Sequence, residues 1–222
     1  MSIVHIATLP QRRESLLKTI ASLYNQTDHI YVMLNGYGYD PHIPDPQNKI
    51  TKIPENNKYG DAAKVLNLND RKDYVFLCDD DLAYPSNYCE YMIAKHKQYS
   101  PALITLHGRI YKRPVYKSHG GYVQSFHCRK DVTGDHSVDV GGTGVMLIHT
   151  DEFNITMDDC PTKNMLDIWV ARQSHKLNLP IIVAEHTADY LTYTHHRDNI
   201  WNNHRVKDEQ YQVEILKSFL RK

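Results

Sequence analysis

The sequence has no excess of charge of either sign. Lys and Arg together number 26, and Asp and Glu together also number 26. Without a net positive charge, no overall electrostatic attraction draws the chain to nucleic acid or to an anionic membrane. The composition therefore does not indicate either partner class, although a local basic patch is compatible with it.

Closely spaced cysteines and long apolar runs are also missing. The cysteines show no C-x-x-C spacing, which argues against a zinc ribbon and a disulfide framework; they are Cys78, Cys89, Cys128 and Cys160. The first ten residues carry no basic leader, and their apolar run is too short for a signal peptide or a membrane span. We therefore expect a cytoplasmic protein with no integral membrane segment.

The length and continuity of the chain indicate one large domain. Its 222 residues lie near the upper end of ordinary domain size, and the sequence contains no internal repeat or low-complexity tract. We expect a single domain over residues 1–222, with an N-terminal half over 1–107 and a C-terminal half over 108–222.

Strand-like and helix-like patterns alternate along the chain. Strands are predicted at 3–8, 29–34, 49–53, 74–78, 102–106, 138–149 and 181–184. Helices are predicted over 16–24, 61–66, 84–96 and 165–177, and residues 108–138 are expected to form a hairpin or an irregular insertion. This alternation predicts a Rossmann-like α/β fold, with a mainly parallel sheet flanked by helices. In such sheets ligands bind at the carboxyl ends of the strands.

Three consecutive aspartates, Asp79, Asp80 and Asp81, follow the apolar run 74–78. Adjacent carboxylates repel one another, so a cation or hydrogen-bond donors must compensate them. Mg²⁺ and Mn²⁺ suit this role because they accept carboxylate and phosphate oxygens together. If the segment stays extended, Asp79 and Asp81 point to one face and converge on one ion, while Asp80 points to the other. A helix cap or a solvated acidic turn is the alternative.

These residues and their surroundings resemble a known enzyme family. The segment 73–82 (DYVFLCDDDL), followed by Tyr84-Pro-Ser and a helix, is similar to the DxD element of GT-A glycosyltransferases, especially the family-2-like inverting enzymes. Residues 6–13 (IATLPQRR) resemble that family's first strand and nucleotide-contacting loop, and 60–64 (GDAAK) resembles a segment that contacts nucleotide or diphosphate. The likeness implies a GT-A fold, a nucleotide-diphosphate sugar donor with UDP-sugar as first candidate, and Mn²⁺ or Mg²⁺ as cofactor.

The resemblance also implies which residues form the site. The implied metal ligands are Asp81, Asp79 and His195, with His186 as the rival histidine. Asp167 is the implied general base that removes the acceptor proton, with Asp158 and Asp159 in reserve. The implied nucleotide-sugar contacts are Thr8, Pro10, Arg12, Asn35, Asp61, Lys64, Asp79, Asp80, Gly142 and Thr143. Asn35 stands where the family usually carries an acidic residue.

We therefore expect a metal-dependent glycosyltransferase that moves a sugar from a nucleotide diphosphate to an acceptor hydroxyl, with inversion. Residues 1–107 would bind the donor, and 108–222 would bind the acceptor, with 197–205 as a flap over the nucleotide. The acceptor is left open among a glycan, a lipid-linked saccharide, a protein and a modified nucleic-acid base. The alternatives are a sugar nucleotidyltransferase and a non-catalytic nucleotide- or carbohydrate-binding module of the same fold.

Overall fold

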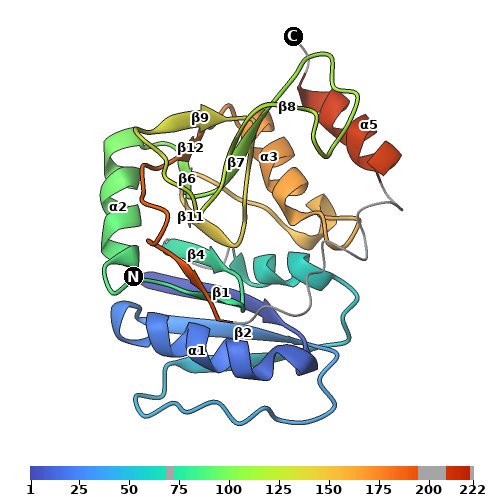
Figure 1. Cartoon of the computed structure of the whole chain (residues 1–222). Helices are drawn as coiled ribbons and strands as arrows, with labels where there is room; N and C mark the ends of the chain where they lie inside the picture. Colours follow the sequence, from blue (N-terminus) through green and yellow to red (C-terminus); the bar gives the residue numbers. More distant parts are fainter. Residues whose placement is uncertain (69–72, 195–208, 221–222) are drawn as a thin grey trace.

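A computed structural model describes residues 1–68, 73–194 and 209–220 (Figure 1). Its central sheet contains β1 (Ser2–Thr8), β2 (His29–Asn35), β3 (Ile50–Glu55), β4 (Tyr74–Cys78), β6 (Leu103–Thr105), β9 (His136–Val138), β11 (Val145–His149) and β12 (Ile181–Val183). Their order across the sheet is β3-β2-β1-β4-β11-β6-β12-β9. The strands β11 and β9 run antiparallel to their neighbours, and the others run in one direction. The predicted mainly parallel α/β sheet is therefore confirmed.

Two smaller sheets and several helices complete the described fold. In one sheet β7 (Gly108–Tyr111) lies between β10 (Val140–Gly141) and β8 (Tyr122–Phe126), and in the other β5 (Leu82–Ala83) pairs with β13 (Thr192–Tyr193). The α-helices are α1 (Arg13–Leu23), α2 (Tyr88–Tyr99), α3 (Leu166–Lys176) and α5 (Glu209–Phe219). Short 3-10 helices are η1 (Pro10–Arg12), η2 (Tyr24–Gln26), η3 (Gly60–Val65) and η5 (Met157–Asp159).

Apolar side chains pack into separate cores on the two faces of the central sheet. On β4, Val75 and Leu77 belong to one core, and Phe76 and Cys78 belong to the other. Residues of α3 and α5 join the first core, whereas residues of α1 and α2 join the second. Figure 1 shows α1 and α3 on different sides of the strands. Because β4 is covered on both faces, its sequence is a continuous apolar run, and the acidic triplet lies at its carboxyl end.

The differences from the predicted elements are local. A helix was predicted over residues 61–66, where the structure has the 3-10 helix η3 over Gly60–Val65. The predicted strand 138–149 is divided among the last residue of β9, the strand β10 and the strand β11. The small sheet formed by β5 and β13 was not predicted, and neither was the helix α5. Among the residues that the structure describes, no helix is long and apolar enough to cross a membrane.

Candidate functional site

The three aspartates lie in a turn directly after β4. Their backbone is no longer extended, because the strand ends at Cys78 and residues 80 and 81 form a turn. Arg12 Nη1 lies 2.7 Å from Oδ1 of Asp80 and 3.2 Å from Oδ2 of Asp81. Asp79 instead meets Lys64, whose Nζ lies 2.5 Å from its Oδ1. The segment was expected to be extended, with Asp79 and Asp81 on one face and Asp80 on the other; it forms a turn instead, in which one nitrogen of Arg12 contacts both Asp80 and Asp81.

The three carboxylates differ in their access to solvent. The side chain of Asp79 is 48% exposed and that of Asp81 is 18% exposed, but that of Asp80 is only 4% exposed. Asp80 is directed into the protein against Arg12, whose own side chain is 12% exposed. A ligand that approaches from solvent therefore reaches Asp79 and Asp81 first.

Three carboxylates and two cations leave an excess of negative charge in this turn. Burial, followed by the charges of Asp79 and Asp80, raises the pKa of Asp81 to about 6. Burial also raises the pKa of Asp80, although Arg12 opposes this change. Burial acts to raise the pKa of Asp79 as well, but the charge of Lys64 outweighs it, and the net direction is downward. A bound cation would offset the repulsion that Asp81 experiences.

Lys64 is a buried cation that joins the acidic turn to the glycine-rich segment 141–144. Besides its ion pair with Asp79, its Nζ donates a hydrogen bond to the carbonyl oxygen of Thr143 at 3.2 Å. The backbone N and Oγ1 of Thr143 both donate to Oδ1 of Asp167, at 2.8 and 2.7 Å. A continuous chain of contacts therefore connects Asp79 through Lys64 and Thr143 to Asp167.

Two carboxylates lie at the start of α3. Asp167 belongs to the first turn of this helix, and Oδ2 of Asp61 accepts a hydrogen bond from the backbone N of Leu166 at 3.1 Å. Negative charge is favourable at a helix N-terminus. Burial nevertheless raises the pKa of Asp61 to about 6, with Lys64 opposing the shift and Asp167 adding to it. The structure thus brings the predicted residues Asp61, Lys64, Asp79 and Asp167 together.

The space around two glycines is fixed by neighbouring side chains. A Cβ added at Gly144 would lie 2.0 Å from Oδ2 of Asp79, so only glycine leaves room for this carboxylate. Gly60 has a φ of +58°, and a Cβ there would lie 2.3 Å from Oδ1 of Asn164. Gly144 therefore leaves space for a carboxylate of the acidic turn, and Gly60 allows the close approach of Asn164.

Buried polar atoms without a hydrogen-bond partner occur at four of the predicted site residues. Within the described part of the chain they include Thr8 Oγ1, Asn35 Oδ1, Asp61 Oδ1 and Asp80 Oδ2. The amide of Asn35 is oriented by its Nδ2, which donates to the carbonyl oxygen of Gly60 at 2.8 Å. Thr8 is the last residue of β1 and Asn35 the last residue of β2. Asp80 follows β4, and Asp61 lies in η3. Because unpaired buried polar groups are costly, this edge of the sheet suits a ligand that offers a cation or hydrogen-bond donors.

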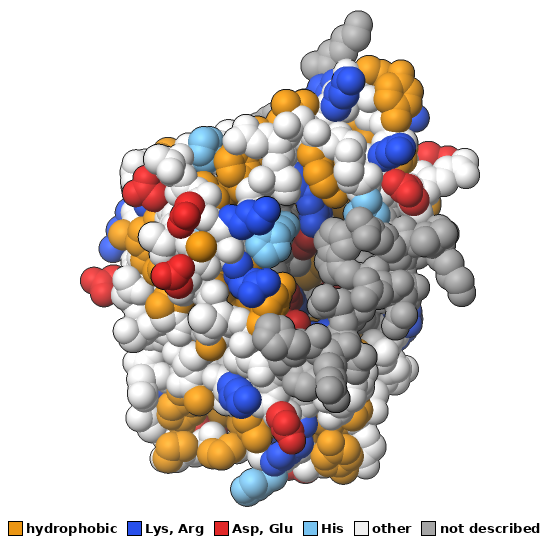
Figure 2. Space-filling view, in the orientation of Figure 1, with side chains coloured by type: hydrophobic (Ala, Val, Ile, Leu, Met, Phe, Trp, Pro, Cys, Tyr) orange, Lys and Arg blue, Asp and Glu red, His pale blue; other side chains and the backbone are white. Residues whose placement is uncertain are grey.

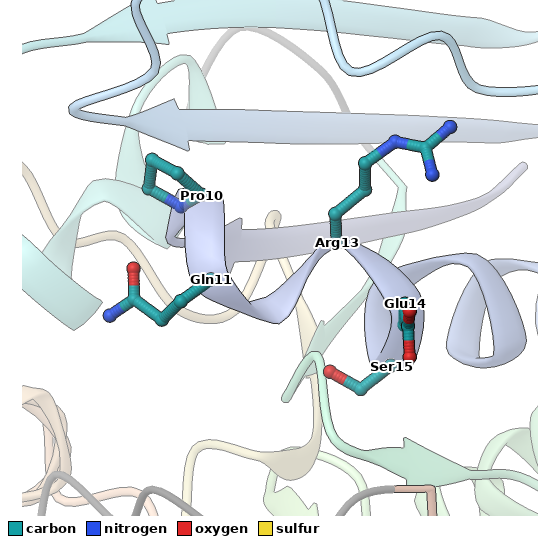
Figure 3. Close-up of a pocket in the computed structure, with 5 residues that line it drawn as sticks. All are labelled: Pro10, Gln11, Arg13, Glu14 and Ser15. Carbon is teal, nitrogen blue, oxygen red and sulfur yellow. The ribbon is translucent and has the colours of Figure 1, made fainter.

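A pocket of about 280 Å³ lies at the start of α1, lined by Pro10, Gln11, Arg13, Glu14 and Ser15 (Figure 3). Figure 3 shows Arg13 extending away from Gln11 and Ser15. Its Nε donates to the carbonyl oxygen of Pro41 at 2.6 Å, and its Nη2 donates to that of His42 at 3.3 Å. Of the two adjacent arginines, only Arg12 therefore contacts the acidic turn.

The remaining predicted residues are placed as follows. His195 and residues 197–205 lie outside the described residues. The rival His186 is 7% exposed, and its Nδ1 lies 2.7 Å from the carbonyl oxygen of Ala184 and its Nε2 3.3 Å from that of His127. Oδ2 of Asp159 accepts hydrogen bonds from the N and Oγ1 of Thr156, so this reserve carboxylate caps η5.

A group of residues that the sequence did not single out lies beside the glycine-rich segment. One ligand atom from each of His107, His127 and Cys128 lies within 4.8 Å of the others. A Cβ added at Gly142 would lie 2.9 Å from the Cβ of His107. Burial, helped by Arg109 and His127, lowers the pKa of His107 to about 3, so its imidazole is neutral. The adjacent pair His127-Cys128 was the only signal in the sequence, and it lacks the spacing of a metal motif.

Neither a family model nor a curated protein matches the sequence. Among solved structures, the chain is similar to a crystal structure of GalNAc-T7 with UDP, GalNAc and Mn²⁺, with a TM-score of 0.58 and 10% sequence identity. The likeness covers 82% of this chain and 42% of that chain. At this identity it is evidence of fold and not of activity. The chain therefore has an α/β fold with a large, mainly parallel sheet, structurally similar to a GT-A glycosyltransferase.

Proposed function

We propose that this protein is a metal-dependent glycosyltransferase that uses a nucleotide-diphosphate sugar, with a UDP-sugar as the first candidate. The observation that carries this proposal is the accessible carboxylate pair of Asp79 and Asp81 at the carboxyl edge of the sheet. A structure of similar fold was solved with UDP and Mn²⁺, which supports the same class of ligand here.

The acidic turn suits a hard divalent cation such as Mn²⁺ or Mg²⁺. Asp79 and Asp81 offer carboxylate oxygens, and the pKa of Asp81 is raised by burial and then by the negative charges of Asp79 and Asp80, which Arg12 and Lys64 oppose without cancelling. We keep His195 as the proposed third protein ligand. When bound, the cation would supply positive charge that stabilises the departing nucleotide diphosphate.

The unpaired acceptors at the sheet edge suit a nucleoside. Oδ1 of Asn35 and Oδ1 of Asp61 are buried without partners in the described part of the chain, and the N–H groups of a base and the hydroxyls of ribose donate hydrogen bonds. Arg12 and Lys64 place positive charge beside the diphosphate while they hold the aspartates in place. The proposed donor contacts are those predicted from the sequence, namely Thr8, Pro10, Arg12, Asn35, Asp61, Lys64, Asp79, Asp80, Gly142 and Thr143.

Asp167 is the proposed general base. Its Oδ1 is held by two hydrogen bonds from Thr143, and among the described residues no hydrogen bond occupies its Oδ2. This oxygen would accept the proton of the acceptor hydroxyl while that hydroxyl attacks the anomeric carbon with inversion. The acceptor stays open among a glycan, a lipid-linked saccharide, a protein and a modified nucleic-acid base, which residues 108–222 would bind.

Metal-dependent nucleotide binding tests the proposal directly. We expect UDP to raise the melting temperature of the protein only when Mn²⁺ is present, because a ligand that binds the folded state stabilises it. Asp81→Asn should remove this shift. Asp40→Asn is the matched control, since Asp40 is 65% exposed and pairs with Lys52 on the surface. An unchanged shift in Asp81→Asn would exclude Asp81 as a metal ligand.

The products of turnover distinguish a glycosyltransferase from the two alternative functions. Release of UDP from a UDP-sugar, with transfer to an acceptor, supports glycosyl transfer. Release of pyrophosphate from a nucleoside triphosphate and a sugar phosphate would instead identify a sugar nucleotidyltransferase. Donor binding with neither hydrolysis nor transfer across a broad acceptor panel would identify a non-catalytic module of the same fold.

A further inference from the structure

Basic side chains lie on the side of the acidic turn opposite Arg12. They form a set that we call the basic cluster, made up of His107, Arg109, His127, Arg129 and Lys130. The first two lie at the start of the β7–β8 hairpin and the others follow β8, and the rings of His107 and His127 have centroids 5.1 Å apart. Figure 2 shows Lys, Arg and His side chains around a hollow in the middle of one face of the molecule.

The sheet order separates this cluster from the cations of the proposed donor site. Arg12 follows β1, which pairs with one edge of β4, whereas the chain reaches His107 after β6, which lies beyond β11 on the other side of β4. The acidic turn at the end of β4 therefore lies between two sets of positive charge. Arg12 and Lys64 are already paired with aspartates of the turn.

Among the residues that the structure describes, Arg129 has no such acidic partner. Its Cζ lies 3.7 Å from the ring centroid of Tyr193. Its Nε is buried without a hydrogen-bond partner, and no carboxylate of the described residues forms an ion pair with it. Tyr193 belongs to β13 and pairs with Leu82, the residue that follows Asp81. A guanidinium without an ion-pair partner among the described residues thus lies on an aromatic ring close to the acidic turn, which is a geometry suited to an anion.

The positive charges of the basic cluster affect the pKa of its histidines. Burial lowers the pKa of His127, and the charges of Arg129, Lys130 and Arg109 lower it further. Each positive charge disfavours a second one nearby. An anion bound among these side chains would reverse this effect.

The same charge argues against a metal ion at His107, His127 and Cys128. Burial raises the pKa of the Cys128 thiol to about 12, so the sulfur keeps its proton near neutral pH. Nδ1 of His127 already accepts a hydrogen bond from the backbone N of Arg129 at 3.2 Å. A metal ion would have to displace the thiol proton of Cys128 and bind among arginine and lysine side chains.

We propose that the basic cluster binds an anionic group of the acceptor, a phosphate or a carboxylate, and so positions the acceptor opposite the donor. This inference rests on the proposed function and names the acceptor class for it. A guanidinium recognises both groups through paired hydrogen bonds. The donor diphosphate has cations of its own in Arg12, Lys64 and the divalent ion, so the basic cluster is a second and separate anion site.

Binding of inorganic phosphate tests the site without knowledge of the acceptor. Calorimetry is run first with EDTA and no nucleotide, and then with saturating UDP and Mg²⁺. We expect phosphate to bind in both conditions. Arg129→Gln should weaken binding about five- to tenfold, as expected for one lost charge-assisted hydrogen bond. Arg129→Lys keeps the charge and should retain most of the affinity. Arg113→Gln should bind as the wild type does, because that arginine is 37% exposed and pairs with Asp139.

Three outcomes would overturn the inference. Competition between UDP and phosphate would assign the cluster to the donor site, loss of phosphate binding in EDTA would assign the anion to a metal, and unchanged affinity in a folded Arg129→Gln would remove Arg129 from any anion site. If Arg129→Gln does not fold, His127→Asn takes its place in the same titration. Failure of UDP to bind with Mg²⁺ while phosphate still binds would contradict the proposed function and leave the anion site intact.

A transfer assay then distinguishes phosphate from carboxylate. A neutral sugar, its 6-phosphate and its uronic acid are offered as acceptors at equal concentration. We expect at least one charged acceptor to be used about tenfold better than the neutral sugar, and Arg129→Gln to remove that preference. Equal use of all three acceptors by the wild type would contradict the inference.

Discussion

Replacing Gly144 with alanine tests whether the position of the Asp79 carboxylate governs metal binding. The new Cβ would lie 2.0 Å from Oδ2 and 2.3 Å from Cγ of Asp79. These separations are far shorter than any ordinary van der Waals contact, so the carboxylate must move. The φ of Gly144 lies outside the left-handed region, and alanine therefore brings no backbone strain of its own. Any effect comes from the displaced carboxylate.

The magnitude follows from the ion pair that Asp79 forms with Lys64. Breaking a buried pair costs about 3–5 kcal/mol, whereas an exposed pair contributes about 0–1 kcal/mol. Lys64 is 3% exposed and Asp79 is 48% exposed, so we expect the free energy of unfolding to fall by about 1–3 kcal/mol. Displacing a metal-binding carboxylate should weaken Mn²⁺ binding in the presence of UDP by about 10–100-fold.

Urea denaturation measures the change in the free energy of unfolding. A Mn²⁺ titration followed by electron paramagnetic resonance measures the change in Mn²⁺ affinity. Gly38→Ala is the control, because a Cβ at Gly38 would meet no atom within 4 Å. It should leave both quantities unchanged. If folded Gly144→Ala binds Mn²⁺ as tightly as the wild type at the same UDP concentration, the position of the Asp79 carboxylate does not govern metal binding.

The remaining predictions concern three carboxylates. The folded pKa of Asp61 is about 6, above its ordinary value of 3.8, so the folded state binds this proton more tightly and its contribution to stability is lost as pH rises from about 4 to 6. In urea denaturation Asp61→Asn should therefore be more stable than the wild type by about 1–3 kcal/mol at pH 7 and similar to it near pH 3.5; equal stability at both pH values would contradict the buried charge. Because the pKa of Asp81 is also about 6, protonation should weaken calorimetric binding of UDP with Mn²⁺ at pH 5 relative to pH 7, and a pH-independent affinity would count against this ligand. Asp167→Asn keeps an oxygen for Thr143, so UDP binding should change less than about threefold while transfer falls about 10²–10⁴-fold; equal loss of both would place Asp167 in the donor site.

The sequence predicted the elements whose pattern is local. The apolar run 74–78 coincides with β4, because burial on both faces of the sheet requires apolar side chains at every position. The position of the three aspartates at its carboxyl end followed directly. Their ion pairs with Lys64 and Arg12 did not, because contacts between distant segments leave no local pattern.

Long-range pairing also explains what the sequence missed. The antiparallel insertion of β11 between β4 and β6 depends on partners about 40 and 70 residues away along the chain. The basic cluster was missed for the same reason, since it joins residues 107 and 109 to residues 127–130 across the β7–β8 hairpin. Those residues lie at or within a segment without any clear period, so only the folded chain brings them together.

Lys64 has a consequence for any attempt to redesign this protein. Its ammonium group contacts Asp79 and the carbonyl oxygen of Thr143, and Thr143 in turn holds Asp167. A substitution that moves Asp79, the carboxylate proposed to bind the cation, is therefore expected also to move Asp167, the group proposed to take the proton. Effects of changes at Asp79 and Asp167 should not add in a double-mutant cycle. Donor preference and turnover would have to be engineered together, because one buried ammonium group supports both.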